Sequence, residues 1–399
     1  MKLFLAFALP ALLAAIMPSA QANDWPNWRG PHLNGVSDEK GWQERWPAAG
    51  PKALWRASVG TGFASFSVSA GQVYTMGNRD NTDTVFCLDA GTGNILWRHS
   101  YPCPLDPNSF EGGPCATPTV ADGRVYTFSR KGDVCCLDAA KGTVLWSKNL
   151  NRELGLPPPT WGCAGSALVE GKTIVLNMGS AGVALNKASG SVAWVSGKSA
   201  GAYATPVPMM LGPDRCLAIL SRQSLMAVRA SDGQVQWSYP WTTLYDVNAA
   251  DPIVASNWVF LSSGYDHGCA LLSVTAQGAR AIWQNKNIRN HFNSCVLWAG
   301  YVYGPDDSGL RCVKFTTGEL KWTYREFGKG SLMVADGKLV ALSENGELII
   351  ADPSPAAFQP VSRSKVLTGK CWTTPVLANG HIYCRNAVGD VVCLDVSGK

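Results

Sequence analysis

The chain has 399 residues and a formal net charge of +5, and only 16% of its residues are charged. Its lysines and arginines are spread along the sequence without forming a basic stripe, which argues against nucleic acid as a partner. Sixteen tryptophans indicate instead a large area of aromatic-rich sheet that has to be buried.

Residues 1–22 have the pattern of a signal peptide. Lys2 precedes an apolar run from Leu3 to Met17, and Ala20-Gln21-Ala22 has the small-x-small pattern that signal peptidase recognises. The run is shorter than a membrane-spanning helix requires, and no second long apolar stretch follows it. We therefore predict export to the periplasm or secretion, with a mature chain that begins near Asn23 and has no transmembrane segment.

The segment that follows, residues 23–50, is rich in tryptophan, proline and glycine. Four tryptophans, at positions 25, 28, 42 and 46, would be unusual in a free tail because large aromatic side chains are normally buried. We predict an ordered N-terminal arm that lies against the main domain, which we expect to span residues 51–399.

A docking frame of eleven residues recurs along the main domain. In each copy a small residue stands ten positions before a tryptophan, and a glycine occupies the seventh position. The glycine permits the positive φ that a hairpin turn needs, and the tryptophan can cover the neighbouring sheet. The five copies are Cys87–Trp97, Cys136–Trp146, Ala184–Trp194, Ala227–Trp237 and Cys312–Trp322.

Each docking frame follows two apolar strands that a tight polar turn connects, such as Ala121-Asp122-Gly123. A unit therefore contains four strands and recurs every 40 to 50 residues or so, at roughly the spacing of β-propeller blades. Tryptophans mark the outer strand of six units, including a looser copy at Trp283. A seventh unit, residues 330–367, has no tryptophan, and Phe358 is its nearest substitute.

The last unit begins at Trp372 and ends at Asp395 after three strands. Residues 52–58 have the pattern of a fourth strand, with Trp55 in the docking position, yet they stand before any first strand. Pairing the two segments completes an eighth blade and leaves no open edge at the seam. We therefore predict an all-β, eight-bladed propeller with four-stranded antiparallel blades, closed by an N-terminal strand that pairs with the C-terminal blade.

The docking frame resembles the tryptophan-docking motif of the quinoprotein dehydrogenase superfamily, whose units are called PQQ-like repeats. The resemblance extends from Trp55 to Asp395, and five copies match in register. It implies the propeller fold without implying one activity. The superfamily contains PQQ-dependent alcohol dehydrogenases, and also non-catalytic propellers such as the scaffold subunit of the outer-membrane barrel-assembly machinery.

The loops that enter the innermost strands of a propeller lie together around the mouth of its central channel. In this sequence they carry aromatic and polar side chains, a combination typical of ligand sites, although such residues could also cap strand ends and hold loops. The candidate mouth residues are Glu111, Trp161, Tyr203, Asp246, Asn248, His291, Asn293, Lys329, Lys370 and Trp372.

The resemblance also implies an enzymatic alternative, a PQQ-dependent alcohol dehydrogenase that uses PQQ and calcium. Such an enzyme needs oxygen ligands for Ca²⁺, for which the sequence offers Glu111, Asn248, and Asp246 or Asp251. It also needs an aromatic ring that stacks on the quinone, for which the sequence offers Trp161 or Trp372. No local motif fixes these residues, and the chain lacks the long inserted loops that bury the cofactor in the dehydrogenases. We therefore favour a monomeric, non-catalytic binding or assembly scaffold, without cofactor or metal, that holds a protein, peptide or glycan at its mouth.

Thirteen cysteines are an odd number, so at least one has no disulfide partner within the chain. Cys135 and Cys136 lie within a predicted strand, where adjacent side chains point to opposite faces, which argues against a disulfide between them. Cys87, Cys136, Cys312 and Cys393 occupy the small-residue position of the docking frame and are interpreted as buried packing residues; Cys103 and Cys115 flank one long loop and are the candidates for a disulfide.

Overall fold

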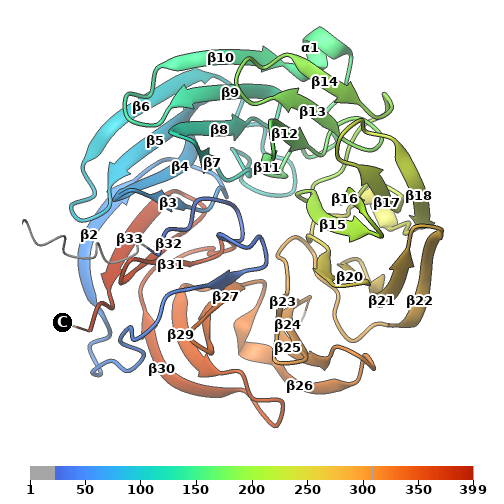
Figure 1. Ribbon diagram of the computed structural model, residues 1–399. Coiled ribbons are helices and arrows are strands. Elements are labelled where there is room, and N and C mark those ends of the chain that lie inside the picture. The colour runs from blue at the N-terminus through green and yellow to red at the C-terminus, as the bar shows by residue number, and fades with distance from the viewer. Residues whose placement is uncertain (1–22, 308, 399) are drawn as a thin grey trace, which may run out of the picture.

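The computed structural model describes residues 23–307 and 309–398, so the predicted signal peptide lies outside the described residues. The described residues form eight sheets around a central axis, seven of four strands and one of five (Figure 1). The chain is therefore an all-β, eight-bladed propeller, as the sequence predicts.

Each of the first four blades runs from its innermost to its outermost strand. Their strands are β3 (Ser67–Ser69), β4 (Gln72–Arg79), β5 (Thr82–Asp89) and β6 (Ile95–Pro102) in blade 1; β7 (Thr119–Ala121), β8 (Arg124–Phe128), β9 (Asp133–Asp138) and β10 (Val144–Asn149) in blade 2; β11 (Leu168–Glu170), β12 (Thr173–Leu176), β13 (Val183–Asn186) and β14 (Val192–Val195) in blade 3; and β15 (Val207–Leu211), β16 (Asp214–Leu220), β17 (Ser224–Arg229) and β18 (Val235–Pro240) in blade 4.

The remaining blades follow the same plan. Their strands are β19 (Ile253–Ala255), β20 (Trp258–Ser263), β21 (Gly268–Thr275) and β22 (Gly278–Asn285) in blade 5; β23 (Val296–Trp298), β24 (Tyr301–Asp306), β25 (Gly309–Lys314) and β26 (Leu320–Tyr324) in blade 6; β27 (Ser331–Ala335), β28 (Lys338–Leu342), β29 (Glu347–Asp352) and β30 (Gln359–Lys365) in blade 7; and β31 (Val376–Ala378), β32 (His381–Arg385) and β33 (Asp390–Asp395) in blade 8. Short helical turns connect some of them: α1 (Leu150–Leu154), η1 (Leu244–Asp246) and η2 (Arg325–Phe327).

The ring closes through β2 (Lys52–Ser58). This strand pairs antiparallel with β33, with Trp55 opposite Cys393, and becomes the outermost strand of blade 8. The pairing confirms the predicted closure, and it satisfies the backbone groups that β33 would otherwise expose as a sheet edge.

In the described part of the chain, seven outer-strand tryptophans dock on the blade that follows them. The indole N–H of each donates to a backbone carbonyl oxygen at 2.8–3.2 Å, as Trp55 does to Ala90. The repeat glycine lies under the ring: Gly93 has a φ of +73°, and a Cβ atom there would lie 2.5 Å from the Trp55 ring. The glycine is thus required both by the turn and by the close approach of the tryptophan.

Blade 7 has no outer-strand tryptophan, and the N-terminal arm fills its seam with blade 8. Trp42 of the arm is buried in one hydrophobic cluster with Val340 of blade 7 and Leu394 of blade 8. Phe358 does not take the place of the missing tryptophan. Its ring lies 5.5 Å from that of Trp322, so it receives the tryptophan of blade 6 instead of docking on blade 8.

The arm also crosses the central channel (Figure 1). Its short strand β1 (Val36–Ser37) pairs in parallel with β27 as a fifth, innermost strand of blade 7. Trp25 forms a β-bridge with Val68 in blade 1, and the Glu39 carboxylate accepts the Gly380 amide N–H of blade 8 at 2.8 Å. The arm is therefore ordered, and it enters the ring as well as lying against it.

All thirteen cysteines are free thiols, so the expected Cys103–Cys115 disulfide is wrong. The Cys103 thiol is buried beside Asp83, whereas Cys115 Sγ faces the Gly113 carbonyl oxygen at 3.7 Å, so the two sulfur atoms lie in different surroundings. The small-residue cysteines are fully buried, and each lies opposite a docking tryptophan, which confirms their packing role: Cys87 with Trp97, Cys136 with Trp146, Cys312 with Trp322 and Cys393 with Trp55.

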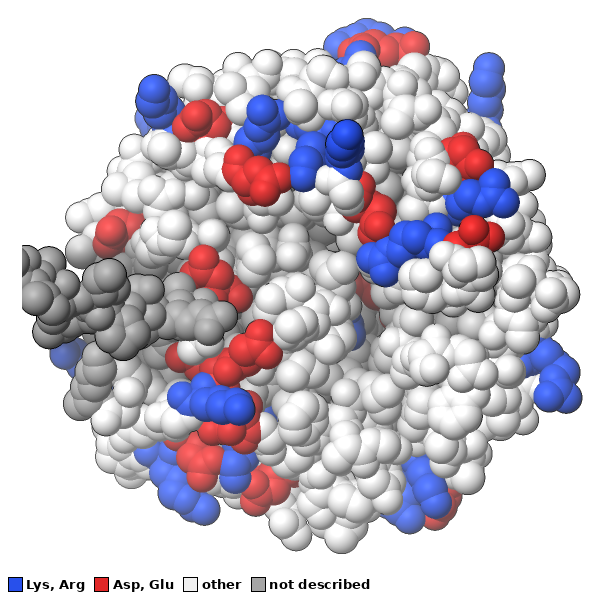
Figure 2. All heavy atoms as spheres, viewed as in Figure 1, with Lys and Arg blue, Asp and Glu red and all other residues white. Residues whose placement is uncertain are grey.

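No helix among the described residues is long and apolar enough to cross a membrane. Acidic and basic side chains are interspersed over the face that Figure 2 shows. Several are paired on the surface, as Lys187 is with Asp122 at 2.6 Å. On this face the charges therefore form local pairs and not one field of a single sign.

Candidate ligand-binding cavity at the propeller mouth

A belt of small polar side chains surrounds the channel at the start of the innermost strands. In seven blades the belt residue stands two positions before the first strand, and in blade 7 it is the first residue of β27. Backbone N–H groups of five members donate to the side-chain oxygen of the next blade's member at 2.7–2.9 Å, which locks neighbouring blades together. The members are Ser65, Thr117, Ser166, Thr205, Asp251, Ser294, Ser331 and Thr374.

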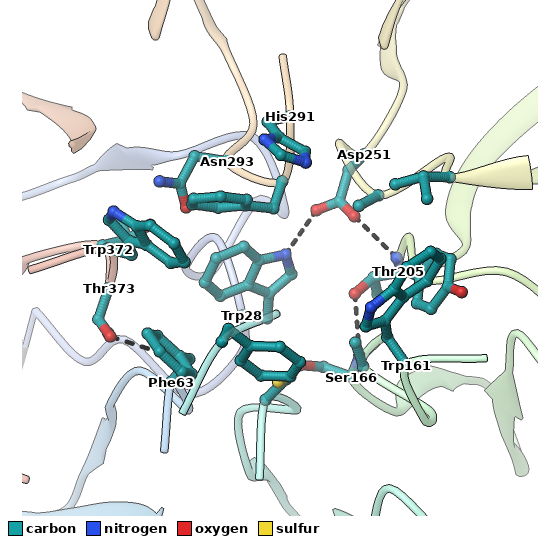
Figure 3. A pocket seen from close by; sticks show the side chains of 18 of the residues that line it. Trp28, Phe63, Trp161, Ser166, Thr205, Asp251, His291, Asn293, Trp372 and Thr373 are labelled. Carbon is teal, nitrogen blue, oxygen red and sulfur yellow. Dashed lines mark hydrogen bonds between the residues drawn. The ribbon is translucent and has the colours of Figure 1, made fainter. Parts of the chain in front are cut away.

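Asp251 is the acid of this belt, and it holds the arm in place. Its Oδ2 atom accepts the Trp28 indole N–H at 2.5 Å, and its Oδ1 atom accepts the Thr205 amide N–H at 2.7 Å (Figure 3). Arg29 Nε lies 3.9 Å from the same carboxylate, and both side chains are buried. Burial raises the pKa of Asp251 and lowers the pKa of Arg29, while each charge offsets the cost of burying the other.

Above the Trp28 ring lies a cavity of about 240 Å³. Its wall is mostly aromatic, and the arm supplies its floor (Figure 3). Loops of seven of the eight blades contribute to it, and blade 7 supplies none of its lining. The lining residues are Trp28, Phe63, Ser109, Phe110, Cys115, Trp161, Ala164, Ser166, Tyr203, Thr205, Val247, Ala249, Asp251, Tyr265, His291, Phe292, Asn293, Trp372, Thr373 and Thr374.

The aromatic side chains pack against one another and so hold the wall in shape. The rings of Phe63 and Trp372 are stacked with centroids 5.7 Å apart, and Phe292 lies 4.4 Å from Trp372. On the opposite side Trp161 contacts Tyr203 and Tyr245 at 6.2 and 6.5 Å. Because each ring has aromatic neighbours, the cavity is preformed and does not depend on a ligand for its shape.

Half of the ten predicted mouth residues line this cavity: Trp161, Tyr203, His291, Asn293 and Trp372. The others surround it or hold its loops. Glu111 forms an ion pair with Lys370 at 2.7 Å, and Lys370 Nζ lies 4.2 Å from the centre of the Trp372 ring. Lys329 Nζ contacts His291 Nδ1 at 2.8 Å.

Two of the predicted residues face away from the cavity. The Asp246 carboxylate forms an ion pair with Arg222 at 2.5 Å. Asn248 is fully buried, where its Nδ2 donates to the carbonyl oxygens of Ser221 and Trp241 and its Oδ1 accepts from a serine hydroxyl. Asn248 thus holds the loop before β19 in place, since all its hydrogen-bonding groups are used within the protein.

Several lining residues were not among the predicted ones. Phe292 lies between two predicted residues, His291 and Asn293, so its position in the same loop could have identified it as a lining residue. Phe110 likewise precedes the predicted Glu111. Trp28 offered no local signal, because it reaches the cavity only through the long-range path of the arm.

The backbone at the rim is strained. Tyr245 and Asp246 have φ angles of 63° and 56°, in the left-handed region that non-glycine residues rarely occupy. Leu244 and Tyr245 are also exposed, by 58% and 63%. Strained, exposed apolar residues beside a cavity are a feature of binding sites more than of structural loops.

The side chains at the mouth do not fit PQQ held with Ca²⁺. Among the described residues, no three His, Cys, Asp or Glu side chains are placed to hold a metal ion together. Glu111 and Asp246 pair with basic side chains, and both Asp251 oxygens accept N–H groups. The lining also contains no lysine or arginine to meet the three carboxylates of PQQ. Of the oxygen atoms proposed for the metal, those of Asp246, Asn248 and Asp251 are therefore already engaged, and only Oε2 of Glu111 is buried without a hydrogen-bond partner in the described part of the chain.

Comparisons with known proteins agree with the repeat pattern. The PQQ_2 family, described as outer membrane protein assembly factor BamB, matches residues 81–324. A search of curated sequences finds no match. Among solved structures, BamB from Moraxella catarrhalis has a TM-score of 0.62 at 16% identity, covering 86% of this chain and 99% of that one. Quinohemoprotein alcohol dehydrogenase from Comamonas testosteroni has a TM-score of 0.68 at 13% identity, covering 94% of this chain and 81% of that one.

The structural neighbours include a computationally designed protein, Ika8, with a TM-score of 0.63 at 12% identity, covering 87% of this chain and all of that one. An assembly factor, an enzyme and a designed protein thus share this architecture, so structural similarity shows the fold alone. The family match is more specific, because it covers more than half of the sequence. We conclude that the chain belongs to the PQQ_2 family of BamB-type β-propellers.

Proposed function

We propose that this protein is an exported, non-catalytic binding or assembly scaffold, which holds an apolar part of a protein partner in its mouth cavity. The observation that supports this most directly is the preformed aromatic cavity, whose floor is the protein's own arm. A cavity of about 240 Å³ is smaller than most sites that enclose a whole small molecule, which hold roughly 300–1,000 Å³. It suits an anchoring side chain of a larger partner.

The rim supports a partner that extends beyond the cavity. Leu244 and Tyr245 present exposed apolar surface, and Tyr245 also contacts Trp161 and Tyr265 of the cavity wall. The apolar surface therefore continues from the cavity onto the outer face. Burying a central aromatic pocket together with an apolar rim is how many protein interfaces obtain most of their affinity.

Export is part of the same proposal. It rests on the signal-peptide pattern of residues 1–22 and on membership of a family described as an outer membrane protein assembly factor. We expect the protein to act in the periplasm, as a monomer whose partner binds at the mouth.

A fluorescence titration tests the cavity directly. The mature chain is titrated with the apolar dye 1-anilinonaphthalene-8-sulfonate (ANS), and we expect saturable binding of one dye per protein. Trp161→Ala should weaken this binding at least tenfold, because it removes one side of the wall. Leu96→Ala, which alters an exposed residue of β6, is the matched control and should bind the dye as the wild type does.

A parallel titration with PQQ and Ca²⁺ tests the enzymatic alternative. We expect no saturable change in the quinone absorption spectrum and no alcohol-dependent dye reduction. Saturable PQQ binding with turnover would overturn the proposed function, and so would ANS binding that is equal in Trp161→Ala and wild type.

A further inference from the structure

On the loop before β23, two polar atoms of the cavity wall, His291 Nε2 and Asn293 Oδ1, lie without a hydrogen-bond partner within the described residues (Figure 3). Neither is among the buried polar atoms that lack a hydrogen bond, so both remain accessible from the cavity. In an otherwise aromatic lining, such a pair defines which polar group a ligand has to carry.

The chemistry of His291 is set by Lys329. The Lys329 ammonium group has only hydrogens to offer, so at 2.8 Å it donates to His291 Nδ1. Nδ1 must then be the unprotonated nitrogen, and Nε2 carries the hydrogen. Burial and the nearby Lys329 charge lower the pKa of His291 to about 4, which keeps the ring neutral at physiological pH. His291 therefore presents one N–H donor to the cavity.

The chemistry of Asn293 is fixed in the same way by the backbone of the next loop. Its Nδ2 lies 3.1 Å from the Lys329 carbonyl oxygen and 2.8 Å from that of Gly330. Carbonyl oxygens only accept, so the amide nitrogen must face them and the oxygen must face the other way. Asn293 therefore presents one acceptor to the cavity, and one short segment, residues 329–330, orients both side chains.

We infer that His291 and Asn293 form a subsite for the backbone N–H and C=O of one residue of an extended peptide, whose apolar side chains occupy the aromatic cavity. That residue's C=O accepts the His291 Nε2–H, and its N–H donates to Asn293 Oδ1, because these two groups of one extended residue point to the same side. This inference rests on the proposed function and adds the class of ligand to it.

A donor beside an acceptor distinguishes an extended peptide backbone from other polar groups. A carboxylate would meet the Asn293 oxygen with a second acceptor, and an ammonium group would find no second acceptor in place of the His291 N–H. A sugar would bring several hydroxyl groups, but Thr205 and Asp251 are already committed to the belt and Thr373 to the Phe63 carbonyl oxygen. The Trp161 indole N–H and the Tyr265 hydroxyl could meet one or two of the sugar hydroxyl groups, and burying the others without partners would cost free energy.

The test uses a blocked dipeptide, N-acetyl-Leu-Phe-N-methylamide, and an analogue whose Leu–Phe amide is replaced by an ester. Both compete with ANS for the wild-type protein, so the readout is displacement of a dye whose binding is measured independently. We expect the ester to bind about tenfold more weakly, because it lacks the N–H that donates to Asn293.

The variant His291→Phe keeps a ring of similar size and removes the donor. We expect the ratio of its dipeptide affinity to its ANS affinity to fall about tenfold relative to the wild type, because the donor serves the dipeptide alone. His99→Phe, a histidine of β6 in the outer strand of blade 1, is the matched control and should change neither affinity. N,N′-diacetylchitobiose, which carries amides on a sugar, should not compete.

The two proposals fail in different ways. If ANS binds but the dipeptide does not, or binds equally as amide and ester and equally to wild type and His291→Phe, the amide subsite is wrong and the apolar cavity stands. Competition by diacetylchitobiose without competition by the dipeptide would likewise replace the peptide with a glycan. If ANS itself fails to bind, the proposed function is wrong.

Discussion

The two ends of the central channel are built differently. At one end the arm seals the ring, and its polar groups are paired: Asp24 accepts from the β3–β4 turn, and Glu39 accepts from backbone amides of blade 8. At the other end the wall is aromatic, and His291 and Asn293 line the cavity. Trp28 connects the two ends, because it belongs to the arm while its ring forms the cavity floor. One end thus serves stability, and the other is where we propose that a partner binds.

The largest effect should come from removing residues 23–58. This truncation deletes both the arm and β2, so blade 8 keeps three strands and β33 becomes an open edge. We expect loss of the cooperative thermal transition and of the near-ultraviolet circular dichroism signal, not merely a lower Tm. A shorter truncation that removes residues 23–41 keeps β2 and should still unfold cooperatively, at a lower Tm. Equal behaviour of the two variants would contradict the closing role of β2.

Asp251→Ala should be the most damaging single substitution at the junction of the two ends. It leaves the N–H groups of Trp28 and Thr205 without an acceptor and Arg29 without its buried counter-charge. Breaking a buried pair in this way costs about 3–5 kcal/mol of unfolding free energy, measured by urea denaturation. Asp232→Ala removes an exposed acid paired with Arg229 and should cost less than about 1 kcal/mol. If the two losses are similar, Asp251 does not hold the arm.

The pH dependence of stability should report on His291 at the binding end. Its pKa is about 4 in the folded protein and 6.5 when unfolded, and the groups that face it are Lys329 and the Tyr265 ring. Between these values the unfolded chain binds a proton that the folded protein does not, so stability is complete above pH 6.5 and falls toward pH 4. Because His291 is partly exposed, we expect it to contribute about 1–2 kcal/mol of this loss. His291→Phe should lose correspondingly less stability between pH 7.5 and pH 4.5; an unchanged slope would contradict the assignment.

The smallest effect should come from Tyr245→Gly at the rim. Glycine adopts the left-handed conformation without strain, which should raise the free energy of unfolding by up to about 1 kcal/mol. The same change removes an exposed ring that contacts Trp161 and Tyr265, so ANS binding should weaken severalfold. A gain in stability with a loss of binding would show that the rim is strained for function; a loss of both would show that Tyr245 is structural.

The sequence predicts the ring well because each blade repeats a local pattern. The docking frame requires a glycine and a tryptophan at fixed spacing, and the unpaired last unit requires a strand such as residues 52–58. The seam at blade 7 was less predictable, because Trp42 replaces the missing tryptophan from a distant part of the chain. No short-range pattern indicates that a segment will cross the channel.

The sequence predicted where the candidate site lies better than it predicted what each residue does there. Loops before the innermost strands do meet at the mouth, and His291, Asn293 and Trp372 were found in this way. The same reasoning also selected Asn248, whose hydrogen bonds are all internal. Residues that face a ligand and residues that hold a loop have the same composition, so only the three-dimensional hydrogen-bond pattern separates them.

The pairing of β2 with β33 also determines when the protein can fold. β2 is among the first strands to be made and β33 is the last, so blade 8 cannot form until synthesis is nearly complete. Until then β2 and the tryptophans of the arm have no partner, and such unpaired segments are prone to aggregate. Closing so long a loop also makes folding slow. The pairing of β2 with β33 closes the finished ring, but it leaves the growing chain with unpaired, aggregation-prone segments until the last blade has been synthesised.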